Sequence, residues 1–278
     1  MNIQTSNWLM FFDTETTWII KDEKGNIISN WSMIQLAYRL IKDWKKEDKD
    51  MFFMTDTPIE ISSMAIHGIY PDLLKRKSNW KYLDDQKREE LSKLFLNNII
   101  IAHNIDFDKD VLKNEKIDFS ENQIDTLKVA RIMLSEWVLE YKWKQPEFLN
   151  LQYLRYFFEL YEINDSEWIA ECTTAHDAFW DVVVLENVFY KLFEIVKNNL
   201  KLNDEDILEK MIEMTKKEFV MVKNMRVGKY RWRTFEEVAN IDKQYLQWMI
   251  WADFTEDIKY TCKVWLGITE DKKFFNKT

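Results

Sequence analysis

The segment 9–17 reads Leu-Met-Phe-Phe-Asp-Thr-Glu-Thr-Thr, so that four apolar residues lead directly into two acids. Such a run predicts a buried β-strand, over 8–13. Because alternate residues of a strand point to the same face, Asp13 and Glu15 project from one side and lie about 6–7 Å apart along the strand. Two carboxylates this close repel each other unless a cation lies between them, and hard ions such as Mg²⁺ take carboxylate ligands. Taken alone, the pair favours a solvated strand end, whereas matching acids elsewhere in the chain would favour a metal site.

The chain has 278 residues, of which 46% are hydrophobic, so it can bury one large core, alone or with a small appendage. It contains no apolar run of about 18 residues and no basic-then-apolar start, so we expect no membrane insertion, no export and a cytoplasmic location. The net charge of −9 argues against a protein that coats nucleic acid through its overall field, although a local basic groove stays compatible with it. Cys172 and Cys262 lie far apart, which favours two reduced thiols over a zinc site or a disulfide.

Apolar patterning predicts two more strands, over 33–40 and 51–54, and a polar turn over 21–30. Strands joined by short polar links favour an antiparallel meander. Helical spacing over 86–96 leads into a short, continuously apolar strand over 99–102, and a helix followed by a strand indicates an α/β layer arrangement.

The rest of the chain is mostly helical in pattern. Helices are predicted over 107–114, 126–138, 151–160, 178–197 and 203–222. Within 178–197 an apolar stripe recurs at helical spacing, which is typical of a helix packed on a core.

A second group of polar residues, His103-Asn104-Ile105-Asp106-Phe107-Asp108, follows the predicted strand 99–102. This places Asp108 at the start of a helix that leaves the carboxyl end of a strand, where ligands of α/β sheets commonly gather. Alone, an acid at that point is more often a partner of the helix dipole, and we assign Asp106 that role.

A third group, His176-Asp177-Ala178-Phe179-Trp180-Asp181, opens the predicted helix 178–197. Five residues do not stack on one helical face, so His176 is expected in the preceding loop and Asp181 one turn inside the helix. A histidine with a pKa near neutrality can take a proton from a water molecule that lies between cations. Alone, His176 fits a capping residue better.

The three groups in this order resemble the motifs of the DEDDh 3′→5′ exonucleases of the DnaQ-like superfamily. The motifs are Phe-Asp-x-Glu-Thr, His-Asn-x-x-Phe-Asp and His-Asp-Ala-x-x-Asp, and the segments 65–69 and 124–127 also occur where that family has them. The resemblance spans about residues 7–197. It implies a ribonuclease-H-like α/β fold, with a mixed five-stranded sheet flanked by helices, and two-metal hydrolysis of phosphodiester bonds.

The resemblance also implies roles for the acids. Asp13 would bridge two Mg²⁺ ions, Glu15 and Asp181 would complete one site, and Asp108 would orient the other ion through water. Mn²⁺ can take the same sites. Two ions about 3.5–4 Å apart stabilise both the attacking and the leaving oxygen.

The resemblance gives His176 the role of general base. Thr16 and His67 match positions that line the pocket for the terminal nucleotide in that family.

The segments 227–235 and 241–248 resemble the small C-terminal module of exodeoxyribonuclease X-like proteins. We therefore predict an exonuclease domain over 1–200, a helical linker over 201–224 and the C-terminal module over 225–278. Basic residues of the module, interleaved with Tyr230 and Trp232, suit phosphate contact and base stacking, and a solvated basic linker is the alternative. Those assigned to substrate binding are Lys229, Arg231 and Arg233.

Glycine and tryptophan depart from the family pattern. The chain has 4 Gly and 13 Trp, although glycine is ordinarily about 7% of a protein. Trp18, Trp180 and Trp232 stand where the resembled motifs have glycine or a small residue. Other tryptophans in turn-like or glycine-tolerant settings are Trp31, Trp44, Trp143 and Trp251. Since glycine and tryptophan are near opposites in size and backbone freedom, we hypothesise a reassigned stop codon that is read as glycine in the source organism.

The function that this sequence favours is a 3′→5′ exodeoxyribonuclease, a phosphodiester hydrolase acting at the 3′ end of single-stranded or frayed duplex DNA and releasing nucleoside monophosphates. An RNA-trimming exonuclease with the same chemistry is the second interpretation. A catalytically impaired nucleic-acid-binding scaffold, obstructed by Trp18 and Trp180, is the third. The resembled family includes homodimers, so self-association stays open.

Overall fold

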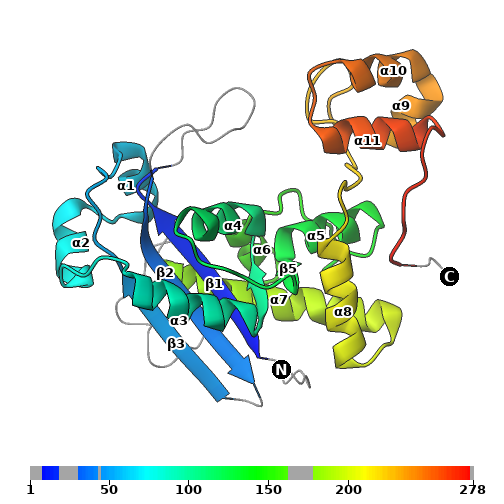
Figure 1. Ribbon diagram of the computed structural model, residues 1–278. Helices are drawn as coiled ribbons and strands as arrows, with labels where there is room; N and C mark the ends of the chain where they lie inside the picture. The colour runs from blue at the N-terminus through cyan, green and yellow to red at the C-terminus, as the bar shows by residue number, and fades with distance from the viewer. Residues whose placement is uncertain (1–7, 19–30, 43–44, 162–177, 276–278) are drawn as a thin grey trace. The chain divides into compact units, whose positions relative to one another are not determined.

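The computed structural model describes residues 8–18, 31–42, 45–161 and 178–275. The chain divides into two compact units, whose helices and strands are labelled in Figure 1. The first comprises Met1–Thr126 with Asn150–Lys191, and the second comprises Leu127–Leu149 with Leu192–Thr278. The predicted turn over 21–30 lies outside the described residues. The exonuclease domain over 1–200, the linker over 201–224 and the module over 225–278 stay a prediction.

A five-stranded sheet forms the centre of the first unit. Its strands are β1 (Leu9–Thr16), β2 (Met33–Lys42), β3 (Lys45–Phe52), β4 (Ile99–Ala102) and β5 (Gln123–Asp125). The strand order is β3-β2-β1-β4-β5, with β1-β2 and β2-β3 antiparallel and β1-β4 and β4-β5 parallel. The predicted antiparallel meander and the mixed sheet are therefore confirmed, and β1 is the central strand.

The prediction for β3 was wrong at both ends. The strand was expected over 51–54, but it begins at Lys45 and ends at Phe52. Its first six residues are charged, as suits the edge of a sheet, where charged side chains oppose pairing with another chain. Only Met51 and Phe52 at the end of β3 are apolar, so a search for apolar residues detects only the end of the strand.

The helices of the first unit are short, apart from the one that continues into the second. They are α1 (Ile61–His67), α2 (Pro71–Ser78), α3 (Asp85–Leu96), α4 (Ile105–Asn114), α6 (Leu151–Phe157) and the start of α7 (Ala178–Leu200). The second unit holds the rest of α7, nearly all of α5 (Thr126–Ser135), α8 (Asp204–Thr215), α9 (Phe235–Ile241), α10 (Lys243–Trp251) and α11 (Glu256–Trp265).

The predicted helix over 203–222 is too long, because α8 ends at Thr215. The apolar pattern continues past that point, but the backbone leaves the helix and finds other hydrogen-bond acceptors. The N–H of Val220 donates to Asp257 Oδ1, and the N–H of Val222 donates to Thr261 Oγ1 of α11. Two other predicted helices, 126–138 and 151–160, also end three residues early, at Ser135 and Phe157.

The two faces of β1 pack against different helices. Phe12 makes an edge-to-face contact with Phe95 of α3, with ring centroids 4.9 Å apart. Phe11, which points to the other face, makes the same kind of contact with Phe189 of α7 at 5.3 Å. Because strand residues alternate, Asp13 and Glu15 share the face that α7 covers, whereas Thr14 shares the face of α3 and α4.

A buried ion-pair network ties α7 to the sheet. The guanidinium of Arg39, in β2, is only 1% exposed and contacts Asp48 at 2.6 Å and Glu186 at 2.7 Å. Lys46 reaches the same glutamate at 3.0 Å. Burial lowers the pKa of Arg39, but hydrogen bonds to Asp48 and Glu186 outweigh burial and raise the pKa above its usual value. The network therefore fixes the helix that carries Asp181.

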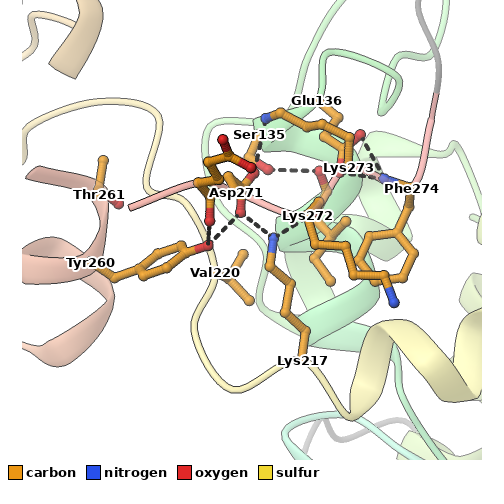
Figure 2. Close-up of polar contacts among 12 residues, drawn as sticks. Ser135, Glu136, Lys217, Val220, Tyr260, Thr261, Asp271, Lys272, Lys273 and Phe274 are labelled. Carbon is orange, nitrogen blue, oxygen red and sulfur yellow. Dashed lines mark hydrogen bonds and ion pairs between the residues drawn. The ribbon is translucent and has the colours of Figure 1, made fainter. Parts of the chain in front are cut away.

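In the second unit, the segment after α11 returns to α5 and α8 (Figure 2). Lys217 contacts the buried carboxylate of Asp271 at 2.5 Å, and Tyr260 Oη donates to the same carboxylate at 2.9 Å. The Glu136 carboxylate accepts the backbone N–H groups of Phe274 and Phe275 at 3.0–3.1 Å. We call residues 271–275 the C-terminal strap.

Cys262 is buried in the core of the second unit, where it packs with residues of α9 and α10. Burial raises the pKa of its thiol to about 11, which agrees with an ordinary reduced cysteine. Cys172 lies outside the described residues.

Replacing Arg39 by methionine tests the ion-pair network. The variant leaves the Glu186 carboxylate buried without its main partner, so we expect the free energy of unfolding to fall by about 3–5 kcal/mol in urea denaturation. Lys49→Met, which removes an exposed cation from β3, is the matched control and should change it by less than about 1 kcal/mol. Equal losses in the two variants would mean that Arg39 is not the anchor of α7.

Candidate active site

Three carboxylates meet at the carboxyl end of β1. Asp13 and Glu15 of β1 and Asp181 of α7 each offer an oxygen, and these oxygens lie within 4.8 Å of one another. Asp181 is 8% exposed, and the two acids of β1 are half-buried. The structure thus brings together three of the four acids singled out from the sequence. A set of three carboxylate oxygens suits a hard divalent cation such as Mg²⁺ or Mn²⁺.

The packing of α7 explains how Asp181 reaches the strand. Phe189 holds the helix against Phe11, and Asp181 lies about two helical turns earlier. One carboxylate oxygen of Asp181 accepts a hydrogen bond from Gln152 Nε2 of α6 at 2.6 Å. Gln152 was not foreseen from the sequence, since a glutamine on a short helix carries no signal of its own.

Asp108 is not part of this three-carboxylate cluster. It lies in the first turn of α4, is 2% exposed, and accepts a hydrogen bond of 2.6 Å from Thr14 Oγ1. Burial raises the pKa of the Asp108 carboxyl to about 7, although the hydrogen bond from Thr14 acts in the opposite direction. The neighbouring charge of Asp125 adds to the increase. A buried carboxyl with a pKa near neutrality is common at functional sites.

The turn that launches α4 is held by the segment 124–127. The N–H of Asn104, which has a left-handed backbone with φ of 70°, donates to Asp125 Oδ1 at 3.0 Å. Thr126 Oγ1 donates to the carbonyl of Ala102, so it accepts from Nδ1 of His103 at 2.9 Å. These contacts give the motif residues Asp125 and Thr126 a structural role, which is to position the helix that carries Asp108.

Thr16 and His67, which were assigned to the nucleotide pocket, contact each other. The Ile69 N–H donates to His67 Nδ1 at 3.0 Å, so Nε2 carries the proton and donates to the carbonyl oxygen of Thr16 at 3.2 Å. Both residues are buried: Thr16 is 7% exposed and His67 is 9% exposed. The histidine therefore holds the end of β1 against α1, and the pocket-lining role of both residues stays a prediction.

His176 lies outside the described residues, so its role as a base also stays a prediction. Trp180 and Trp18 are described and half-buried. The guanidinium of Arg155, in α6, lies 4.9 Å from the centroid of the Trp180 ring.

The three basic residues assigned to substrate binding, Lys229, Arg231 and Arg233, fall into two groups. Lys229 Nζ lies 3.2 Å from Asp242, which also accepts from Tyr230 Oη at 2.8 Å, and Tyr230 packs edge-on against Tyr245. Tyr230 is thus used inside the module. Arg231 and Arg233 are exposed, and within the described part of the chain no carboxylate lies in ion-pair range of either. These two arginines are the module's candidates for phosphate contact.

The raised pKa of Asp108 gives the metal-free protein a defined pH dependence. In the unfolded chain this carboxyl loses its proton near pH 3.8, but in the folded chain only near pH 7. The folded state therefore holds the extra proton between these values, and stability falls as pH rises through this window. Asp108→Asn should remove this slope in urea denaturation with chelator present. Asp106→Asn, an exposed acid on the same helix, should retain it, and an unchanged slope in Asp108→Asn would contradict the assignment.

Known proteins resemble this chain in both sequence and structure. Residues 228–252 match the family model described as exodeoxyribonuclease X-like C-terminal. A structure of exonuclease X, solved in complex with 5′ overhanging duplex DNA, superposes with a TM-score of 0.50 at 19% identity, covering 74% of this chain and 99% of that chain. The ubiquitin-hydrolase-like and RNA exonuclease module of Saccharomyces cerevisiae Pan2, solved with AAGGA RNA, gives 0.46 at 16% identity, covering 74% of this chain and 31% of that chain.

A comparison of the whole sequence with curated proteins gives no significant match. Among the helices that the structure describes, none combines the length and apolar character that a membrane span requires. The likeness to exonuclease X rests on the fold, and the module match rests on sequence. The chain therefore has the α/β fold of exonuclease X, with a mixed five-stranded sheet, and contains a segment that is similar to the exodeoxyribonuclease X-like C-terminal family.

Proposed function

We propose that this protein is a metal-dependent 3′→5′ exonuclease that hydrolyses phosphodiester bonds from the 3′ end of DNA and releases nucleoside monophosphates. The observation that carries the proposal is the meeting of Asp13, Glu15 and Asp181 at the end of the central strand. The fold of exonuclease X and the match over 228–252 support it.

Asp13, Glu15 and Asp181 would hold the divalent ions, with Mg²⁺ as the natural metal and Mn²⁺ able to substitute. Bound there, a pair of such ions supplies charge that stabilises the attacking and leaving oxygens of the phosphate. Gln152 holds the Asp181 carboxylate by a hydrogen bond of 2.6 Å, which supports its position beside the two acids of β1. Asp108 would act on the second ion through water.

His176 precedes α7 by two residues, and Asp181 lies in the first turn of that helix. From this position in the sequence, His176 would act as the general base for the water that attacks the phosphate. The imidazole would take the proton from that water as the bond between the water oxygen and phosphorus forms and the bond from phosphorus to the 3′ oxygen of the remaining strand breaks. That 3′ oxygen would then take a proton from solvent. Thr16 and His67 would contact the terminal nucleotide.

Activity assays on labelled oligonucleotides test this function. With Mg²⁺, a 5′-labelled DNA strand should shorten in steps from its 3′ end and yield mononucleotides. Preference for RNA would move the proposal to RNA trimming. Binding of DNA and RNA without any hydrolysis, under Mg²⁺ or Mn²⁺, would favour a scaffold and contradict the enzyme.

Two substitutions test the roles at the metal site. His176→Ala should slow hydrolysis by about 10²–10⁴-fold, the usual contribution of a positioned acid or base, while metal affinity measured by titration stays the same. Asp13→Ala should lower both activity and metal affinity. Asp106→Ala, an exposed acid beside Lys109, is the control and should be as active as the wild type. Wild-type activity in His176→Ala would remove its assigned role.

Substitution of Arg231 and Arg233 tests the module. Phosphate contacts contribute affinity and salt dependence more than sequence preference, so the double alanine variant should bind single-stranded DNA more weakly and reduce the slope of log K against log salt by about 2. Lys87→Ala with Lys93→Ala removes the same charge from α3, where both lysines pair with glutamates, and should leave the slope unchanged. Identical slopes in the two double variants would give the arginines another role. Lys229, which is paired with Asp242, should contribute less.

A further inference from the structure

Four tryptophans have a backbone conformation that tryptophan rarely adopts. Trp80, Trp137, Trp143 and Trp232 lie in the left-handed region, with φ of 60°, 62°, 65° and 75°. For a bulky residue such a φ is an outlier, because Cβ approaches the following carbonyl oxygen. The three described glycines, Gly68, Gly228 and Gly267, all have φ between 72° and 79°. The four tryptophans thus share the conformation of the chain's glycines.

Trp137 lies two residues beyond the end of α5, in the position after the C-cap where helices often have glycine. Its N–H donates to the carbonyl of Leu134 at 3.2 Å, and the N–H of Val138 donates to the carbonyl of Met133 at 2.9 Å. This pair of bonds is the Schellman motif, in which the residue after the C-cap is left-handed and most often glycine.

Trp143 occupies the second position of a two-residue hairpin loop. Tyr141 and Lys144 exchange both backbone hydrogen bonds, at 2.9 and 3.0 Å, and both intervening residues have positive φ. Such a loop is a type I′ turn, whose second position is typically glycine. The Trp143 side chain is 95% exposed, so packing does not explain its presence.

Trp80 and Trp232 follow the same rule. Trp80 lies in the turn after α2, where the N–H of Lys81 donates to the carbonyl of Ser78 at 3.0 Å, and it is 64% exposed. Trp232 donates its N–H to the carbonyl of Met225 at 2.8 Å and is 60% exposed. Lys75 lies over the Trp80 ring at 5.8 Å, and Arg226 and Arg231 lie over the Trp232 ring at 5.7 and 4.8 Å. These exposed rings thus contact surface cations, while the backbone of each turn has the conformation of the chain's glycines.

Other tryptophans are used for their side chains. Trp31 is 5% exposed and belongs to the main core. The prediction that it lies in a turn-like or glycine-tolerant setting was therefore wrong. Trp248 lies inside α10 and packs against Tyr245 and Phe254, with ring centroids 5.4 and 5.9 Å away. These six tryptophans therefore fall into two classes: Trp31 and Trp248 pack against other apolar side chains, and the other four lie where a turn favours glycine.

We propose that positions 80, 137, 143 and 232, together with 18 and 180, are glycine in the protein that the source organism makes. A stop codon reassigned to glycine would produce this pattern when it is translated as tryptophan. Glycine at positions 80, 137, 143 and 232 follows from their positive φ. Glycine at positions 18 and 180 rests on the resemblance of the segments around Glu15 and Asp181 to the exonuclease motifs. Resting on the proposed function, the first turn of α7 would then carry no indole beside Asp181, and the basic segment around Arg231 would contact nucleic acid through its cations.

The coding sequence and the natural protein provide the direct test. One and the same codon should stand at positions 80, 137, 143 and 232, and the ordinary tryptophan codon should stand at 31 and 248. Peptides of the protein purified from its source should have the mass of glycine at the four positions and of tryptophan at the other two. The ordinary tryptophan codon, or the mass of tryptophan, at the four positions would overturn the proposal.

Stability measurements on the full-length chain provide a test that is independent of activity. The variant with glycine at all four positions should have a higher Tm than the printed chain, by at least about 2–4 °C, because left-handed strain is relieved. Trp248→Gly is the matched control and should lower Tm, since it removes a packed ring from inside a helix. An unchanged or lower Tm in the fourfold variant would contradict the backbone argument.

A single position separates backbone strain from the mere removal of an exposed indole. Trp143→Ala removes the ring but keeps Cβ, so it retains the strain at positive φ. Trp143→Gly should therefore raise Tm more than Trp143→Ala. An alanine variant at least as stable as the glycine variant would show that the turn does not require glycine.

Discussion

The first unit must hold Asp13, Glu15 and Asp181 close together against the mutual repulsion of their carboxylates. Their oxygens lie within 4.8 Å of one another, so packing elsewhere must hold the two elements together. The contact between Phe11 and Phe189 and the buried pairing of Arg39 with Glu186 provide that force on α7. The apolar and ionic contacts of this helix therefore serve the site directly, and a bound cation would remove the repulsion that they oppose.

The alternation of β1 divides two tasks between its faces. Asp13 and Glu15 point toward α7, while Thr14 between them points toward α4 and donates to Asp108. Residues 13–15 of β1 thus serve two sets of acids. Asp13 and Glu15 belong to the carboxylate cluster, and Thr14 between them holds Asp108 of α4. The two environments differ: Asp13 and Glu15 are half-buried, whereas Asp108 is enclosed enough for burial to raise its pKa.

Patterns of consecutive apolar residues made the buried strands predictable, because β1 and β4 are covered on both faces, and the regular apolar stripe did the same for α7. The acids were singled out by the resemblance of their three ordered motifs to a known family. The charged edge strand β3 and the end of α8 were not predictable, since the first lacks an apolar signal and the second depends on acceptors supplied by Asp257 and Thr261. The support of Asp181 by Gln152 depends on tertiary placement of α6. Single residues on short helices become informative only once their neighbours in space are known.

The C-terminal strap makes the end of the described chain behave like a core segment. Glu136 accepts two backbone N–H groups of the strap, and the largely buried pair of Lys217 and Asp271 fixes its start. Amide protons exchange with solvent only when their hydrogen bonds open, and those of Phe274 and Phe275 can open only if the strap leaves α5. Their exchange rates therefore report on the integrity of the second unit rather than on local fraying.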